Sequence, residues 1–212
     1  MKENFWKLFL FLALLLLLAF SFLVDTPLRS FILQAEGNDW NHSLLHLLSS
    51  ALSRYGDWPE LILLGAFGWG LSKYANNPVW KRLFLMAMIA STMAGAMTNV
   101  LRLSTGRTRP RVSPAHEQGW YGPYHHGTWM IGRSEFNSFP SGHTATAFGF
   151  AFIIFFADSL WGTVALVLAA LIACSRLLLG AHHCSDLLVA IFIAYGISRF
   201  LWNYFPTSIT PE

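Results

Sequence analysis

Residues 5–24 read FWKLFLFLALLLLLAFSFLV, an apolar run with a single charged side chain, Lys7. The hydrocarbon core of a bilayer is about 30 Å thick, and a helix needs around 20 apolar residues to cross it. Lipid offers no hydrogen bonds, so the backbone of such a run must satisfy its own polar groups as a helix. Lys2 and Lys7 would also suit a signal peptide, but no A-x-A cleavage site follows. We therefore expect a permanent membrane-spanning helix.

Five more apolar runs follow, at residues 59–74, 83–101, 141–157, 160–179 and 187–204. The composition agrees with them: 54% of the residues are hydrophobic and 12% are charged, whereas an ordinary soluble domain is about 25% charged. The sequence therefore predicts an all-α fold, a bundle of six transmembrane helices. We expect residues 1–212 to form a single integral membrane domain.

The stretch between the first two runs, residues 25–57, holds one further helical pattern. Its apolar side chains recur at the spacing of one helix face, at Trp40, Leu44, Leu47, Leu48 and Ala51. The segment from residue 40 to residue 52 is too short and too polar to cross a membrane. We expect a helix that lies in the interface, or covers the bundle, between the first two spans.

Lysine and arginine near short loops indicate which side of the membrane each loop faces. With six spans, the cytoplasmic side would carry Lys2, Lys7, Lys73, Lys81, Arg82 and Arg199. The outer side would carry Arg102, Arg107, Arg109, Arg111 and Arg133. Most of these outer arginines fall on one short loop, which Gly106 and Pro110 keep from being helical. An anionic ligand on the outer side would explain this cluster.

Three short segments on that outer side carry side chains suited to chemistry on an anion. They read RLSTGRTRP at residues 102–110, PSGH at 140–143 and SRLLLGAHHCSD at 175–186. An arginine guanidinium presents a planar fork of donors that matches two phosphate oxygens. Pro-Ser-Gly at a helix start exposes backbone N–H groups at the positive end of the helix dipole. His182 and Asp186 are four residues apart, so one helical turn would bring a carboxylate beside the imidazole and fix its tautomer.

Each of these signals alone has a structural explanation. An arginine at a helix end is usually a membrane anchor. A histidine four residues before an aspartate is usually a satisfied pair, and Ser-Gly at a helix start is usually a cap. Their joint occurrence on one face of the membrane instead favours a single site that binds a phosphate group.

Together the three segments resemble the type 2 phosphatidic acid phosphatase family, which also includes the vanadium haloperoxidases. The family pattern is K-x6-R-P, then P-S-G-H, then S-R-x5-H-x3-D. The second and third parts match fully, and the first matches at Arg109 and Pro110. Arg102 stands where the family has lysine, which keeps the cation but changes its donor geometry. The matched motifs extend over residues 102–186.

The resemblance implies a role for each matching residue. His182 would be the nucleophile that forms a phosphohistidine, Asp186 would orient it, and His143 would act first as acid and then as base. The phosphate would be bound by Arg102, Arg109, Ser141, Gly142 and Arg176. The implied activity is hydrolysis of a lipid phosphate or diphosphate without metal or cofactor. We expect a bacterial inner membrane location, with the site facing the periplasm.

Other side chains near the motifs lie outside the matched positions. Arg107 and Arg111 flank the site, and we expect them to be solvated rather than to bind a second phosphate. His125 and His126 are adjacent, but no third ligand has the spacing of a metal site. We expect the loop at residues 112–139 to be an aromatic interfacial loop that shapes the lipid entrance.

The net charge and the cysteines argue against nucleic-acid binding and against a cysteine metal site. The formal net charge is +3, and no basic helix or lysine-rich tail accompanies it, so nucleic acid is not an expected partner. The two cysteines, Cys174 and Cys184, lack metal-ligand spacing, and we expect both to be unpaired packing residues.

Two alternatives to a hydrolase stay open. A lipid phosphotransferase would use the same phosphohistidine and pass the phosphoryl group to a second lipid. A non-catalytic membrane protein that binds anionic lipids would keep the arginines but would not need His182 or Asp186. These residues determine neither which lipid is the substrate nor the oligomeric state.

Overall fold

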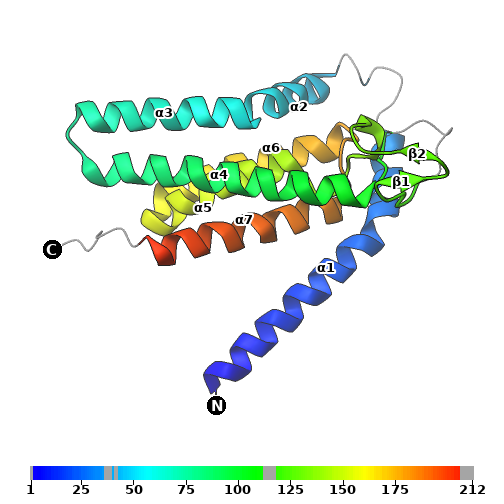
Figure 1. Cartoon of the computed structure of the whole chain (residues 1–212), viewed down its shortest axis with the longest axis horizontal. Coiled ribbons are helices and arrows are strands. Elements are labelled where there is room, and N and C mark those ends of the chain that lie inside the picture. The colour runs from blue at the N-terminus through cyan, green and yellow to red at the C-terminus, as the bar shows by residue number, and fades with distance from the viewer. Residues whose placement is uncertain (1, 36–39, 41–42, 112–117, 206–212) are drawn as a thin grey trace.

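The structure is a computed structural model that describes residues 2–35, 40, 43–111 and 118–205 (Figure 1). Its helices are α1 (Lys2–Ala35), α2 (Leu44–Tyr55), α3 (Trp58–Tyr74), α4 (Pro78–Thr105), η2 (Ser134–Phe136), α5 (Gly142–Ala157), α6 (Ser159–Leu178) and α7 (Cys184–Tyr204). Two short strands, β1 (Tyr124–His125) and β2 (Thr128–Trp129), pair antiparallel between α4 and α5. The predicted all-α fold is therefore confirmed.

Helix α5 forms the centre of the bundle and contacts α3, α4, α6 and α7. It approaches α4 closely at Gly149, where an added Cβ would lie 3.0 Å from the carbonyl oxygen of Ala90. On its other side, the Ser198 hydroxyl of α7 donates to the Gly149 carbonyl at 3.1 Å. Small residues and interhelical hydrogen bonds are the contacts that hold helices together in lipid, where apolar surface alone gives little driving force.

Four of the described helices are long and apolar enough to cross a membrane, by length and composition. They are Leu12–Gln34 within α1, then α4, α6 and α7. Large apolar side chains such as Leu23, Leu63 and Leu160 are about 70% exposed, which suits lipid as the solvent. The protein is therefore an integral membrane protein. The other two runs form α3 and α5, of 17 and 16 residues, and for these two helices spanning stays a prediction.

Helix α1 is longer than the sequence suggested. The predicted end lay at residue 24, yet the helix continues through Pro27 to Ala35. The apolar run stops before Asp25, and a free carboxylate is costly in lipid. In the structure Asp25 is buried and accepts hydrogen bonds from Arg107 and Ser185. Its charge is therefore compensated within the protein, and the helix continues through Asp25 without a break.

Helix α2 corresponds to the helix predicted between the first two spans, at residues 44–55 rather than 40–52. Ser43 sets its start, because the Ser43 hydroxyl accepts from the His46 N–H at 3.1 Å and caps the first turn. It packs against α6, so α2 covers the bundle, while its place relative to a membrane interface stays a prediction. At its end, an added Cβ on Gly56 would lie 2.5 Å from Ile172 of α6, so glycine permits the tight corner into α3.

The segment between α4 and α5 folds over one end of the bundle, where α1 ends and α7 begins (Figure 1). Gly106 ends α4 in the left-handed region, with φ of 58°. A Cβ there would lie 2.1 Å from the Gly122 carbonyl oxygen, so only glycine allows this return of the chain. The turn places residues 107–111 directly above the α6–α7 junction, where the Arg111 N–H donates to the Gly180 carbonyl at 2.9 Å.

Candidate active site

The three predicted motif segments meet at this end of the bundle. Arg102 comes from the last turn of α4, and residues 141–143 begin α5. His182 lies in the turn between α6 and α7. The Ser141 N–H donates to the Asp186 carbonyl at 3.2 Å, and a Cβ on Gly142 would lie 3.1 Å from Arg102 Nη2. Residues far apart in the sequence thus form one site.

His182 is 2% exposed and is held in one tautomer. Its Nδ1 lies 2.6 Å from the Ser138 carbonyl oxygen. A carbonyl can only accept, so Nδ1 carries the proton and Nε2 keeps its lone pair. Burial, with smaller contributions from the charges of Arg176 and Arg109, lowers the pKa of His182 to about 4, although Asp186 opposes the shift. The imidazole is therefore neutral near pH 7, the state that a nucleophile needs.

Asp186 lies behind this imidazole without a hydrogen bond to it, since its Oδ2 is 3.7 Å from His182 Nδ1. Its carboxylate instead accepts from the Ser138 hydroxyl at 2.5 Å, from the His183 N–H at 2.7 Å and from Arg107. The predicted pairing is thus present at ion-pair distance, while the direct hydrogen bond to the ring comes from the Ser138 carbonyl. Sequence spacing could not reveal Ser138, because it contributes a backbone atom.

Two arginines of the motifs have an unpaired donor, although Nη1 of Arg176 donates to the Ser53 hydroxyl. Arg109 Nε and Arg176 Nε are buried and have no hydrogen-bond partner among the described residues. Burial and the charges of Arg111, Arg176 and Arg102 together lower the pKa of Arg109 to about 10, although Asp186 opposes the shift. Buried donors are normally satisfied and clustered like charges repel. A bound anion would correct both conditions at once.

The start of α5 combines a cap with a histidine. The Ser141 hydroxyl accepts from the Thr144 hydroxyl at 2.9 Å, which leaves its own proton free to donate to a ligand. His143 Nε2 lies 3.4 Å from Asp57 Oδ1, at the start of α3. A cavity of about 460 Å³, lined by residues of α3, α4 and α5, opens beside His143, Arg102 and Asp57.

Asp57 was not identified from the sequence. It caps α3 by accepting from the Trp58 N–H at 2.8 Å, and this local role fully explains an aspartate at that position. Only the corner between α2 and α3 brings its carboxylate to His143.

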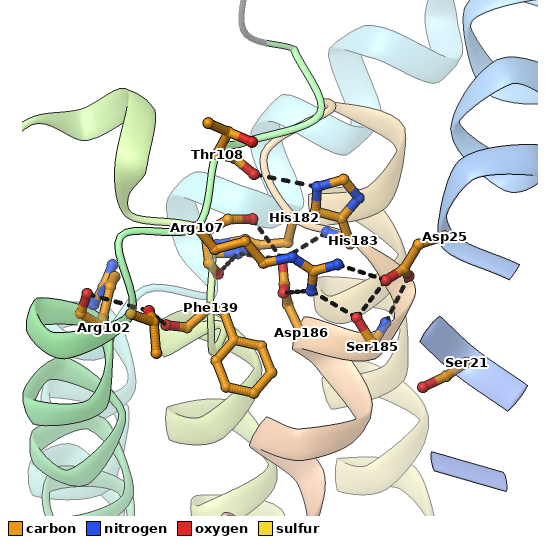
Figure 2. A network of polar contacts seen from close by, with 12 residues as sticks. Ser21, Asp25, Arg102, Arg107, Thr108, Phe139, His182, His183, Ser185 and Asp186 are labelled. Carbon is orange, nitrogen blue, oxygen red and sulfur yellow. Dashed lines mark hydrogen bonds and ion pairs between the residues drawn. The ribbon is translucent and has the colours of Figure 1, made fainter. Parts of the chain in front are cut away.

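The expectation that Arg107 is solvated was wrong. Arg107 is 7% exposed and pairs with Asp25 at 2.7 Å and with Asp186 (Figure 2). Two carboxylates that sit behind the site compensate its charge, which is why it can leave the solvent. Arg111, in contrast, is exposed, as expected, and lines a second cavity of about 250 Å³ between α1 and the α6–α7 turn.

The loop between α4 and α5, which carries β1 and β2, has exposed aromatic side chains. Trp120, Tyr124 and Trp129 are each more than half exposed, and the rings of His125 and His126 lie 4.1 Å apart. Among the described residues, no three His, Cys, Asp or Glu side chains cluster as a metal site would require. Part of the predicted entrance loop, residues 112–117, lies outside the described residues. Its role at a lipid entrance stays a prediction.

The two cysteines are free, as expected. Cys174, however, is exposed on α6 and is not a packing residue. At that position α6 faces outward. Because this helix is apolar on all sides, its sequence does not distinguish the outer face from the inner face.

A bundle of apolar helices, with arginines around a buried, neutral histidine at one end, defines the class of integral membrane proteins. The sequence matches the family model of the PAP2 superfamily over residues 80–210, and the chain therefore belongs to that superfamily.

Two relatives are named lipid A 1-phosphatase. The chain is 29% identical to that of Rhizobium etli over 165 residues, which are 70% of this chain and 66% of that protein. It is 29% identical to that of Rhizobium johnstonii over 167 residues, 70% of this chain and 62% of that protein. The chain thus spans just under two thirds of the length of these relatives. A crystal structure of a PAP2-type phosphatidylglycerolphosphate phosphatase from Bacillus subtilis is similar, with 20% identity, a TM-score of 0.44, and coverage of 91% of this chain and 97% of that one.

Proposed function

We propose that this protein hydrolyses a phosphate group from a membrane lipid, with His182 as the nucleophile. The observation that carries the proposal is the neutral, buried imidazole beside arginine donors that lack a partner. Its Nδ1 proton is bound to the Ser138 carbonyl at 2.6 Å, which leaves the Nε2 lone pair for attack. A site that only bound anions would gain nothing from a histidine held neutral, since a charged one would bind better.

The proposed reaction has two steps. Nε2 of His182 bonds to phosphorus while the bond from phosphorus to the lipid oxygen breaks, and His143 donates a proton to that leaving oxygen. His143 then removes a proton from water, the water oxygen attacks phosphorus, and the bond to His182 breaks to release inorganic phosphate. Both transfers follow general acid–base and nucleophilic catalysis. Asp186 stabilises the imidazole as it becomes charged.

The guanidiniums of Arg102, Arg109 and Arg176 would hold the phosphate oxygens, together with Ser141 and the Gly142 N–H. Negative charge spreads over those oxygens in the transition state, and fixed donors aimed at them lower the barrier. Each charge-assisted hydrogen bond contributes about 1.5–3 kcal/mol net. In this scheme the arginines supply the positive charge, and no metal or cofactor takes part.

The cavity beside His143 suits the rest of the lipid. In an in-line displacement the leaving oxygen departs opposite the nucleophile, and His143 must reach it. The 460 Å³ cavity lies on the His143 side and extends between α3 and α4. The lipid portion of the substrate would therefore leave along these two helices.

The proposed orientation places the site on the outer face of a bacterial inner membrane. Lys73, Lys81 and Arg82 lie around the α3–α4 turn, at the opposite end of α4 from Arg102. That helix has 28 residues, a length of about 42 Å, enough to separate the two membrane faces. With the lysine-rich end in the cytoplasm, the arginine cluster faces the periplasm.

The lipid substrate is proposed as a phosphate monoester or diphosphate. The lipid A 1-phosphatase relatives make the 1-phosphate of lipid A the first compound to test. The test incubates purified protein in detergent micelles with lipid A, phosphatidic acid, phosphatidylglycerophosphate and undecaprenyl diphosphate, and measures inorganic phosphate. We expect release from at least one lipid, none from a His182→Asn variant, and an acid-labile phosphoenzyme in the wild type. Full activity of His182→Asn would refute the nucleophile.

A lipid phosphotransferase is tested in the same reactions. If a phosphorylated acceptor lipid accumulates instead of inorganic phosphate, water is not the acceptor. If no lipid loses phosphate but anionic lipids bind equally well to wild type and His182→Asn, the chain is a binding protein.

A further inference from the structure

A buried polar network joins α1 to the segment behind His182 (Figure 2). Arg107 Nη2 donates to Asp25 at 2.7 Å, and Arg107 Nη1 donates to the Ser185 hydroxyl at 2.7 Å and to Asp186. Asp25 also accepts from the Ser185 N–H at 3.0 Å and from the Ser185 hydroxyl at 2.5 Å. One arginine therefore bridges a carboxylate of α1 and a carboxylate of α7.

Aromatic rings enclose the same guanidinium. Arg107 Cζ lies 4.6 Å from the ring centroid of Trp120, 5.4 Å from that of Phe22 and 5.9 Å from that of Phe139. A planar, weakly hydrated guanidinium can stack on rings and still donate in two directions, which a lysine ammonium cannot do as well. The rings and carboxylates together hold Arg107 in one orientation.

Both groups that support the imidazole of His182 are bonded to Arg107. Ser138, whose carbonyl accepts from His182 Nδ1, donates its own N–H to the Arg107 carbonyl at 3.0 Å. Asp186, behind the ring, accepts from the Arg107 guanidinium and from the Ser138 hydroxyl. A displacement of Arg107 would therefore move both supports of the imidazole together.

We infer that Arg107, held in place by Asp25 of α1, is a positioning residue that aligns His182 for attack on the substrate phosphorus. The inference rests on the proposed function, and neither Arg107 nor Asp25 occupies a position of the matched family pattern. In the proposed mechanism Arg107 touches no reacting atom, and it acts on His182 through Ser138 and Asp186. Docking of α1 is in this way required for full turnover, although α1 carries none of the motif residues.

The test compares Asp25→Asn and Arg107→Lys with the wild type in one detergent. Asp25→Asn keeps the size of the side chain and removes the charge that fixes Arg107, and Arg107→Lys keeps the charge and removes the fork. We expect kcat to fall about 10- to 100-fold, because a small misalignment of reacting groups slows the chemical step by that order. KM stays within about threefold, because the phosphate-binding arginines are untouched. The matched controls are Arg133→Lys and Glu135→Gln, exposed charges of the same loop, and both keep wild-type kcat.

A pH profile separates positioning from mere support of the fold. The charged or titratable groups that face His182 are Asp186, Arg109, Arg176 and His143. Replacing Arg107 by methionine leaves Asp186 without its balancing cation, so the carboxylate favours protonated His182. The acid limb of kcat/KM then moves to higher pH, whereas Asp25→Asn, which retains Arg107, does not move it upward. A purely structural role would reduce the amount of folded enzyme and leave the limb in place.

His182→Asn is measured in parallel, so that two failures remain distinct. If His182→Asn retains activity, the proposed function itself is refuted. If His182→Asn is inactive while Asp25→Asn and Arg107→Lys match the wild type in kcat, the positioning role alone is refuted. Should the Arg107 variants not fold, Asp25→Asn decides by its kcat and by comparison with Asp25→Glu, which restores the carboxylate and is expected to recover part of the activity.

Discussion

Acidification should destabilise this protein through His182. In the folded protein, burial lowers the pKa of this imidazole to about 4, whereas an unfolded chain would protonate it near about 6.5. Above the higher value the ring is neutral in both states and stability is unaffected. As the pH falls below the unfolded pKa, the unfolded state binds a proton that the folded state does not bind. The free energy of unfolding therefore decreases until the pH reaches the folded pKa.

The size of the effect follows from the two pKa values. The pKa of about 4 in the folded state corresponds to an accumulated loss of about 3 kcal/mol, at 1.36 kcal/mol for each pKa unit. For a chain of this length that is a fall of the thermal midpoint on the order of 10 °C. The ring is almost fully buried, so solvent screening reduces the figure little.

The assay is thermal unfolding in detergent at neutral pH and near the folded pKa, for wild type and His182→Asn. Asparagine can donate to the Ser138 carbonyl as Nδ1–H does, but it does not titrate. Carboxylates protonate in both proteins, so only the difference between the two pH dependences reports on His182. We expect the midpoint of the wild type to fall further than that of the variant. Parallel curves for the two proteins would refute a buried, neutral His182.

Four further outcomes follow. Arg102→Lys loses the fork of donors, and kcat/KM should fall about 10- to 100-fold, the equivalent of one charge-assisted hydrogen bond; steady-state kinetics checks this. Gly106→Ala places a Cβ 2.1 Å from the Gly122 carbonyl oxygen at φ of 58°, so the thermal midpoint and the yield of folded protein should both drop. Asp57→Asn removes the carboxylate whose Oδ1 lies 3.4 Å from His143 Nε2. Because Asp57 is 48% exposed, the loss should be at most about 1 kcal/mol, a fall in kcat of less than about tenfold. EDTA should leave phosphate release unchanged, and loss of activity that Mg²⁺ restores would point to a metal mechanism.

Helix positions followed largely from the positions and lengths of the apolar runs, and the deviations have physical causes. Helix α1 was predicted to end at a carboxylate, and it continues because Asp25 is paired with Arg107. A sequence contains no sign of which distant cation will neutralise a given acid. The same limit applies to Arg107, whose solvation could be judged only once Trp120 and Asp186 had been placed around it.

Spacing located most of the candidate site, because its residues occur in short motifs. Asp57 and Ser138 were not identified from the sequence, for two different reasons. Asp57 is fully explained locally as a helix cap, and its approach to His143 depends on the corner between α2 and α3. Ser138 acts on His182 through a main-chain carbonyl, and any residue type could have supplied it.

The sequence by itself determined the apolar helices, the membrane as solvent, and the residues that could bind and attack a phosphate group. These properties depend on residue type and on short spacings, which bilayer thickness and helix geometry constrain directly. Only the tertiary structure decided that His182 is neutral with Nε2 free, and that α1 is tied to it through Asp25 and Arg107. Burial and long-range pairing set protonation and orientation, and both depend on packing between segments that are distant in the chain.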